Sequence, residues 1–114
     1  MVTRSEDCVR RDACVQKGEG VVHIKELTNA EQLRGHGRLF NHLVVDPGCS
    51  IGTQAHCQDA EYYYIVRGEG LFDDNGTEVT VRAGDICYTA DGATHALKNH
   101  TQEPLEVIAL VILN

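Results

Sequence analysis

Side chains that bind divalent metal ions occur at two separated places in this sequence. Gln54 and His56 stand two residues apart, Glu61 follows shortly after them, and His95 lies far downstream. Imidazole nitrogens, carboxylate oxygens and amide oxygens are donors that hard and borderline divalent cations accept. Because residues i and i+2 of a strand share a face, Gln54 and His56 can point at one ion. Glu61 and His95 must reach that ion from other strands, so the four residues predict a metal site assembled by a β-fold.

The same four residues belong to two glycine-flanked motifs. The first motif is Gly48, five residues, Gln54-Ala55-His56, four residues, Glu61, six residues and Gly68. The second motif is Gly84, five residues, Ala90-Asp91-Gly92, two residues, His95, three residues and Asn99. Their order and spacing resemble the two consecutive motifs of the cupin superfamily, whose members are small β-barrels also described as jelly rolls. The resemblance extends over about residues 39–113 and implies an all-β, cupin-type barrel.

Two positions depart from the pattern of that family. Gln54 stands in place of the first metal histidine, and Ala90 stands in place of a proline. The resemblance implies one divalent metal ion bound by His56, Glu61 and His95. The amide oxygen of Gln54 would be a fourth and weaker ligand, because it is neutral and binds less firmly than an imidazole nitrogen.

The ligand set is similar to three kinds of metal site. Two histidines and one carboxylate with open positions match the triad of mononuclear iron oxygenases. With Gln54 added, the set is similar to the zinc site of mannose-6-phosphate isomerases, which share this barrel fold. A histidine in place of Gln54 is associated with manganese, iron and nickel in oxalate-handling enzymes and dioxygenases. The resemblance therefore leaves the metal open among zinc, manganese, iron and nickel, and the reaction type open as well.

Two classes of function follow from such a site. The first is a small metal-dependent enzyme of the isomerase, lyase or dioxygenase type, acting on a polar or anionic small metabolite. The second is a non-catalytic barrel that binds or senses a sugar or a carboxylate through its metal. A divalent ion beside one carboxylate keeps a net positive charge, which favours an anionic or polyoxygenated ligand.

A candidate catalytic residue and two arginines follow from the same strands. By alternation from Glu61, Tyr63 faces inward, where it is either a hydrogen-bond donor to the ligand or an aromatic packing residue. Sugar-phosphate substrates usually need arginine or lysine partners. Only Arg67 and Arg82 lie near the barrel segments, and the pattern does not place either of them in the pocket.

The elements that must position the site are short strands. Segments rich in β-formers at regular spacing, with almost no helical periodicity, indicate a sandwich or barrel. Strands are expected at residues 39–46, 62–66, 71–72, 79–81, 86–89 and 105–113, and Asn75-Gly76 predicts a hairpin turn. We assign residues 38–114 to the barrel and residues 1–37 to an N-terminal extension. In the extension we expect partial disorder over 1–18, an edge strand at 21–24 and one helical turn from a capping box at Thr28 to Leu33.

The last predicted strand, residues 105–113, is apolar on both of its faces after the first residues. A strand with one face in water should alternate, so the outer face of this strand is expected to be covered. A second copy of the chain is the preferred cover, which predicts a homodimer. The alternative is that residues 1–37 fold over the same face.

Composition restricts the partners and the location. A chain of 114 residues forms one domain, and a formal net charge of −7 without a lysine or arginine cluster argues against nucleic acid and anionic membranes as partners. We expect a cytoplasmic protein, because the N-terminus lacks an apolar signal segment. The five cysteines are expected to be reduced thiols. Cys57 would be packed outside the pocket, because it alternates with His56, and the role of Cys8 and Cys14 stays open.

Overall fold

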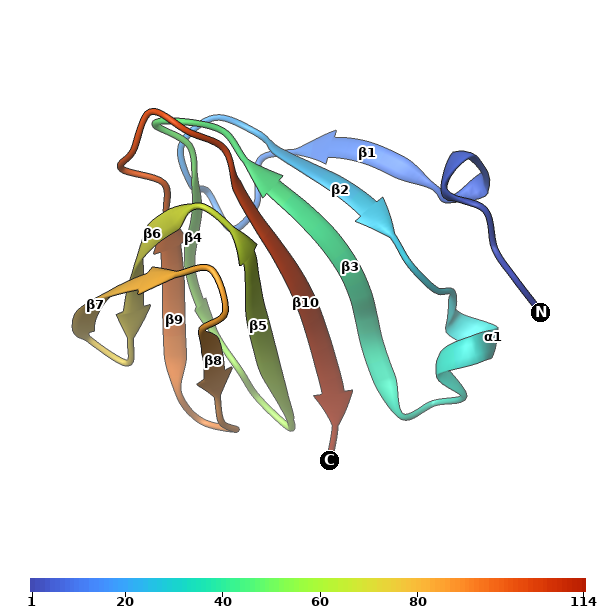
Figure 1. Cartoon of the computed structure of the whole chain (residues 1–114). Coiled ribbons are helices and arrows are strands. Elements are labelled where there is room, and N and C mark those ends of the chain that lie inside the picture. Colours follow the sequence, from blue (N-terminus) through green and yellow to red (C-terminus); the bar gives the residue numbers. More distant parts are fainter.

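A computed structural model describes all residues, 1–114, and consists almost entirely of β-strands (Figure 1). The N-terminal extension contains a 3-10 turn η1 (Ser5–Asp7), β1 (Arg10–Ala13), β2 (Val22–Glu26) and α1 (Ala30–Leu33). The barrel contains β3 (Gly37–Val45), β4 (Ser50–Ala55), β5 (Asp59–Arg67), β6 (Glu69–Asp74), β7 (Thr77–Arg82), β8 (Ile86–Thr89), β9 (Thr94–Lys98) and β10 (Leu105–Leu113).

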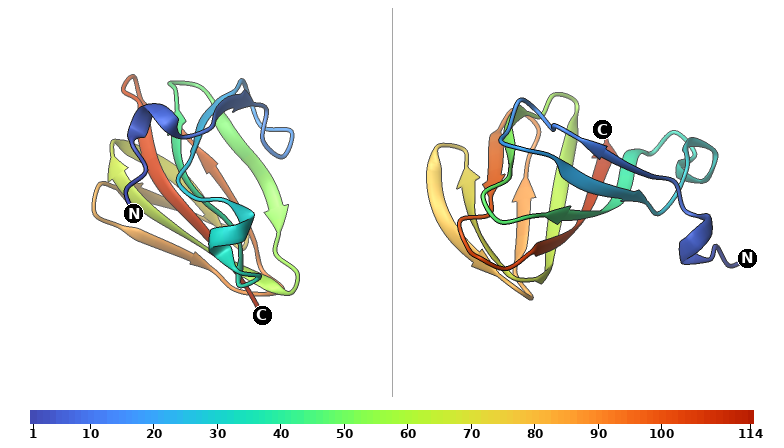
Figure 2. Two further views of the ribbon diagram at one scale, coloured as in Figure 1. Left: turned by 90° about the vertical axis from the view of Figure 1, so that its right-hand side faces the viewer. Right: turned by 90° about the horizontal axis from the view of Figure 1, so that it is seen from above.

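Two antiparallel sheets face each other across the core. The larger sheet has six strands in the order β1-β2-β3-β10-β5-β8, and the smaller has four in the order β4-β9-β6-β7. Seen from above, the two sheets curve round a common interior, and the extension projects to one side (Figure 2). The all-β, jelly-roll-type barrel predicted from the sequence is confirmed.

Alternation along the strands explains the core. In β10, Leu105, Val107 and Ala109 are buried, whereas the residues between them are partly exposed. Inward side chains from both sheets, such as Ile65 and Leu97, meet in one cluster of buried residues. The predicted hairpin is confirmed: Asn75 and Gly76 both have positive φ between β6 and β7, as a type I′ turn requires.

The N-terminal extension closes one side of the barrel. β1 pairs with β2 at the edge of the larger sheet, so the strand predicted at 21–24 exists but is not the edge strand. Beyond β1, the chain crosses to β4, where the amide of Gly52 donates to the carbonyl of Val15 at 3.1 Å. The approach is so close that a Cβ at Gly52 would lie 2.0 Å from the carbonyl oxygen of Gln16. Residues 15–19 therefore link the two sheets.

The predicted helical turn is confirmed as α1, but its cap is one residue later than expected. The side chain of Asn29, not of Thr28, accepts a hydrogen bond from the amide of Gln32 at 2.8 Å. The helix ends at Leu33, and the residue that caps its C-terminus, Arg34, adopts the left-handed conformation. No helix of the chain is long enough and apolar enough to cross a membrane.

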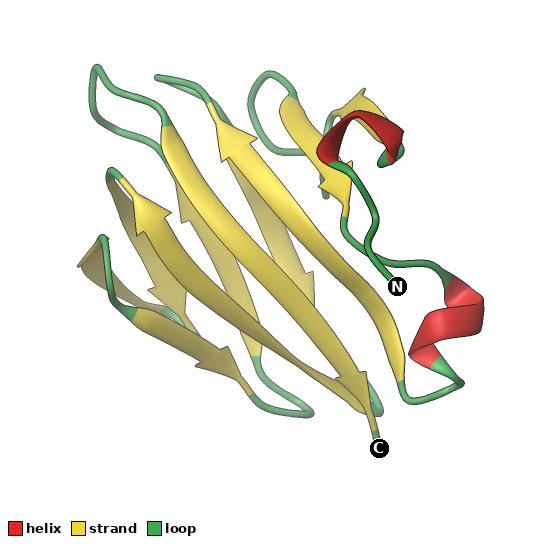
Figure 3. Cartoon of the chain, turned by 45° about the vertical axis from the view of Figure 1, so that its right-hand side comes forward, coloured by secondary structure: helices red, strands yellow, loops and turns green.

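The outer face of the six-stranded sheet carries an uncovered apolar surface over β3, β10, β5 and β8. Its exposed large side chains come from four strands and include Phe40, Tyr62, Tyr64, Val66, Ile86, Tyr88 and Ile112. In Figure 3 the helices lie beside the long strands of this sheet and not across them. The alternative in which residues 1–37 cover this face is wrong, because β1 and β2 extend the sheet edgewise.

Candidate metal centre

Three side chains from different elements converge inside the barrel. His56 follows the end of β4, Glu61 lies on β5 and His95 lies on β9. The Glu61 Oε1 atom is 3.0 Å from His56 Nε2 and 3.1 Å from His95 Nε2, and the two nitrogens are 3.4 Å apart. All three residues are buried. The antiparallel order β4-β9 places Gln54 opposite His95, so Gln54 belongs to the same neighbourhood.

The outer nitrogen of each histidine is held by a second side chain. His56 Nδ1 lies 2.8 Å from Asp59 Oδ1, and His95 Nδ1 lies 2.7 Å from Thr89 Oγ1. A carboxylate only accepts hydrogen bonds, so a His56 ring that binds a metal ion through Nε2 would donate its Nδ1 proton to Asp59. Such partners commonly orient metal-binding histidines in proteins.

Asp59 is itself fixed from the opposite side. Arg38 Nε, at the start of β3, donates to Asp59 Oδ2 at 2.8 Å. Burial acts to raise the pKa of Asp59, but the hydrogen bonds from His56 and Arg38 outweigh it and lower the pKa below its ordinary value. Asp59 is therefore a carboxylate, and Arg38, Asp59 and His56 form a chain that ends at the cluster.

The donor set fits a divalent metal ion. Two imidazole nitrogens and one carboxylate oxygen lie within 4.8 Å of one another, and all three are buried. Three lone-pair-bearing atoms that point at one another are stabilised when a cation lies among them. Nitrogen donors from His56 and His95 suit zinc, iron, nickel and copper, whereas the oxygens of Glu61 and Gln54 are also acceptable to manganese.

A small cavity opens beside this cluster. It has a volume of about 160 Å³, and we call it the inner cavity. Its polar lining residues are Arg11, Gln16, Asn41, Gln54, Glu61 and Tyr63. The remaining lining is apolar and includes Leu39 and Leu43. A cavity of this size admits several waters or a ligand of a few heavy atoms, and it is smaller than the usual pocket for a drug-sized molecule.

Tyr63 lies between the cluster and the aromatic core. Its side chain is only 2% exposed, whereas those of Tyr62 and Tyr64 are 38% and 47% exposed, as strand alternation predicts. Its ring stacks on His95, and its hydroxyl lies 3.5 Å from His95 Nε2. Burial and then the charge of Glu61 raise the pKa of Tyr63 well above its ordinary value. Tyr63 thus keeps its proton, and it both packs and presents a hydrogen-bond donor.

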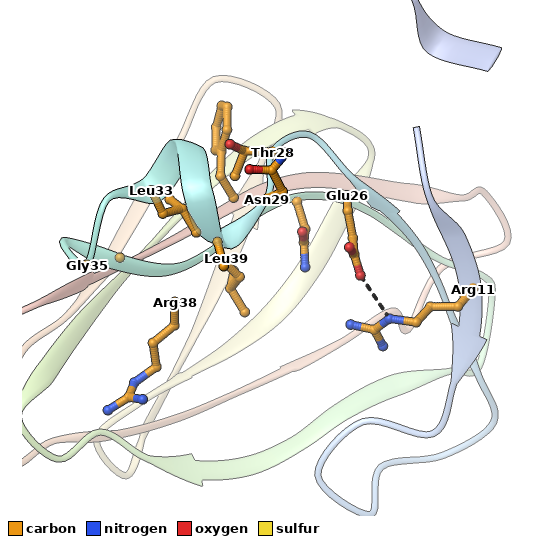
Figure 4. Close-up of a pocket in the computed structure, with 12 residues that line it drawn as sticks. Arg11, Glu26, Thr28, Asn29, Leu33, Gly35, Arg38 and Leu39 are labelled. Atoms are coloured by element: carbon orange, nitrogen blue, oxygen red, sulfur yellow. Dashed lines mark hydrogen bonds and ion pairs between the residues drawn. The ribbon is translucent and has the colours of Figure 1, made fainter. Parts of the chain in front are cut away.

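A second and more open space lies at the mouth of the barrel. This outer pocket has a volume of about 330 Å³ and lies between the N-terminal part of β3, α1 and β1 (Figure 4). It shares Arg11, Leu39 and Asn41 with the inner cavity. These three residues therefore separate the two spaces.

Comparison with known families decides the class of the protein. The sequence model of the cupin domain family matches residues 41–112. This range contains the three candidate metal ligands and Gln54, whereas Arg11, Gln16, Arg38 and Leu39 lie before it. The chain is a cupin. It carries the fold of that family and a His-Glu-His cluster that could hold a metal ion.

Individual relatives of this cupin include proteins concerned with oxalate. It is 38% identical to an oxalate-binding protein from Thermotoga maritima, over 99% of this chain and 94% of the relative. A crystal structure of a predicted oxalate decarboxylase from Thermotoga maritima superposes with a TM-score of 0.95 at 36% identity and covers 100% of both chains. A mannose-1-phosphate guanylyltransferase from Salmonella muenchen is 26% identical over 67% of this chain but only 16% of its own length.

The structure also shows which neighbours of the site the sequence did not reveal. Asp59 and Thr89 were missed because their role depends on which histidine nitrogen faces inward. Arg11 and Asn41 were missed because both lie outside the two motifs. The sequence held one indirect signal for Asn41: it is the only amide in β3, and it lies on the same face of the strand as the buried residues Leu43 and Val45. Cys57 was expected to be packed but is exposed, although it does lie outside the cavity.

Proposed function

We propose that this cupin binds a small carboxylate anion, with oxalate as the leading candidate, through a divalent metal ion at His56, Glu61 and His95. The observation that carries this proposal is the convergence of these three buried ligand atoms beside a cavity of about 160 Å³. A bound divalent ion would supply a positive centre for anionic oxygens. The 38% sequence identity to an oxalate-binding protein, in an alignment over 99% of this chain, supports the choice of anion.

The lining of the inner cavity favours binding without turnover over the enzymatic alternative. Its titratable residues are Arg11, Glu61 and Tyr63. Glu61 is assigned to the metal, arginine stays protonated, and the raised pKa of Tyr63 makes this residue a hydrogen-bond donor and a poor acid. Breaking a carbon–carbon bond of oxalate also requires a proton donor for the product. We assign Tyr63 to hydrogen bonding of the bound anion, and Gln54 to a fourth, weaker metal contact.

Calorimetric titration of metal-defined protein tests this function. Protein stripped by a chelator is reloaded separately with zinc, manganese, iron or nickel, and each form is titrated with oxalate. We expect one metal ion per chain and oxalate affinity only in a metal-loaded form. The failure of every metal form to bind oxalate would overturn the proposal. Formation of formate or carbon dioxide from oxalate would instead support the enzymatic alternative.

We also infer a homodimer that buries the outer face of the six-stranded sheet. Tyr62 and Tyr64 on β5 lie beside Leu110 and Ile108 on β10 in the register, which produces a continuous apolar surface. Monomers seldom leave such a surface in water. A cytoplasmic location and the absence of nucleic-acid and membrane partners stay predictions of the sequence.

A further inference from the structure

Asn41 is a buried amide without a partner. Its side chain is only 5% exposed and makes no hydrogen bond within the chain. Every side-chain nitrogen or oxygen that is sealed from solvent in this structure has a hydrogen-bond partner. Because the amide of Asn41 has none, its atoms must be open to the space beside them. That space is the inner cavity together with the outer pocket. Because no protein group bonds to the amide, its hydrogen bonds must come from water or from a polar ligand in this space.

Arg11 reaches the same place from the N-terminal extension. Its pairing with Ile24 puts it on the inward face of β1, and it lines both the inner cavity and the outer pocket. Its Nε atom forms an ion pair with Glu26 Oε2 at 3.3 Å. Figure 4 draws this contact as a dashed line. The two terminal amino groups of Arg11 make no ion pair or hydrogen bond. Those groups retain the donor fork that suits a carboxylate.

The strand register gives the separation between Asn41 and Tyr63, the residue two positions after the metal ligand Glu61 on β5. Asn41 lies opposite Ala109 on β10, and Ala109 lies opposite Tyr63 on β5. Two steps between antiparallel strands separate Asn41 from Tyr63, which is roughly 10 Å between their Cα atoms. The intervening Ala109 is small, so the space over it is left to the cavity that all three residues line. A ligand of a few heavy atoms can therefore contact both ends.

We propose that Arg11 and Asn41 form a second anchor for the anion, opposite the metal. This inference rests on the proposed function and specifies its ligand class: a small dicarboxylate, whose oxygens turned away from the metal accept from the guanidinium and the amide. Arg11 and Arg38 are each paired with one carboxylate, Glu26 and Asp59, through their Nε atoms, so the group that Arg11 offers an anion is its terminal donor fork. The N-terminal extension thus supplies part of the binding site.

The competing explanation is that Arg11 serves only the ion pair with Glu26. Two variants separate these roles. Arg11→Gln removes both the ion pair and the anchor, whereas Glu26→Gln removes the ion pair and leaves the guanidinium. Arg10→Gln is the matched control, since Arg10 is the neighbour on the opposite face of β1 and carries the same charge.

Oxalate titration of the metal-loaded variants tests the anchor, with metal content measured on each sample. We expect Arg11→Gln and Asn41→Leu each to weaken oxalate binding roughly 10- to 100-fold, as for lost hydrogen bonds to a charged group. Metal content and the affinity for acetate should change little. Glu26→Gln and Arg10→Gln should bind oxalate within about threefold of the wild type.

The outcomes distinguish this inference from the proposed function. Wild-type protein that holds metal and binds oxalate, with Arg11→Gln equal to Arg10→Gln, would overturn the anchor alone. An equal loss in Arg11→Gln and Glu26→Gln would also overturn it, because the ion pair would then be the cause. Absence of oxalate binding in every metal form of the wild type would overturn the proposed function itself.

Discussion

The two faces of the six-stranded sheet come from alternate residues of the same strands but have different chemistry. On β5, Glu61 and Tyr63 point into the barrel, whereas Tyr62 and Tyr64 point outward. The inner face combines polar groups around a small cavity, and the outer face is a broad apolar surface. A shift of one residue in the pairing would exchange the two sets, so register alone decides which residues bind a ligand. Each face should therefore be alterable without the other.

The largest effect should follow the loss of the inner carboxylate. Glu61→Gln keeps the shape of the side chain but removes the charge that faces His56 and His95. We expect metal affinity to fall by more than about 100-fold, since even partners of metal ligands contribute 10- to 100-fold. Measurement of metal content after dialysis checks this. Oligomeric state should stay that of the wild type, and Glu78→Gln, on the exposed face of β7, should retain its metal.

Removing the partner of a ligand should have the next largest effect. Asp59→Asn abolishes the charge that holds the Nδ1 proton of His56, and metal affinity should drop roughly 10- to 100-fold. Competition with a chelator of known affinity measures the change. Arg38→Gln should have a smaller effect, because Arg38 acts only through Asp59. Equal affinity of Asp59→Asn and wild type would show that His56 does not need this orientation.

The corresponding change on the outer face should produce the opposite pattern. Tyr64→Glu puts a charge at the centre of the apolar surface and should weaken dimerisation roughly 10- to 30-fold, the effect of losing an interface anchor. Sedimentation or light scattering over a range of concentrations measures this change. Metal content and oxalate affinity should be retained. Val79→Glu, which changes an exposed apolar residue of β7 in the other sheet, should leave the oligomer intact. A monomeric wild type would contradict the inferred dimer.

The sequence was most informative where spacing and alternation act together. The two motifs locate His56, Glu61 and His95 because their glycines mark turns, and alternation then assigns Tyr63 to the inside. The same rule correctly separated Tyr62 and Tyr64 from the site. Asp59 escaped it because the strand was predicted only from residue 62, although β5 begins at Asp59 and alternation from Glu61 places Asp59 on the same inward face.

The extension was harder to predict for a different reason. β1 is a short, polar edge strand whose composition is typical of a flexible terminus, and it lies in the segment expected to be partly disordered. Its inward direction depends on pairing with β2, and its closeness to β4 depends on Gly18 and Gly52. Such long-range contacts leave no local pattern. Attention to arginines near the barrel motifs therefore pointed to Arg67 and Arg82 and overlooked Arg11, which lies in space beside the cavity.

The smallest predicted effect is a pH dependence of the attachment of β1, through His23 on the outer side of the six-stranded sheet. On the outer side, His23 bridges Asp12 of β1 at 2.8 Å and Asp46 beyond β3 at 2.6 Å. Hydrogen bonds first to Asp12 and then to Asp46 raise the pKa of His23 above 6.5. The protonated ring thus stabilises the attachment of β1 fully below about pH 6.5, and this contribution is lost as the pH rises through the raised pKa.

Because β1 also carries Arg11 on its inner face, this loss should loosen the anchor from outside the cavity. Hydrogen exchange at residues 10–13, corrected for intrinsic rates, should accelerate at most about fivefold as the pH rises from about 6 to 8, as expected for an exposed ion pair. His23→Gln should remove this dependence, whereas His36→Gln, on an exposed residue without side-chain partners, should keep it. The same pH dependence in both variants would exclude His23 as its origin. Its loss in His23→Gln alone, with a matching change in oxalate affinity, would show that the outer face helps to position the inner one.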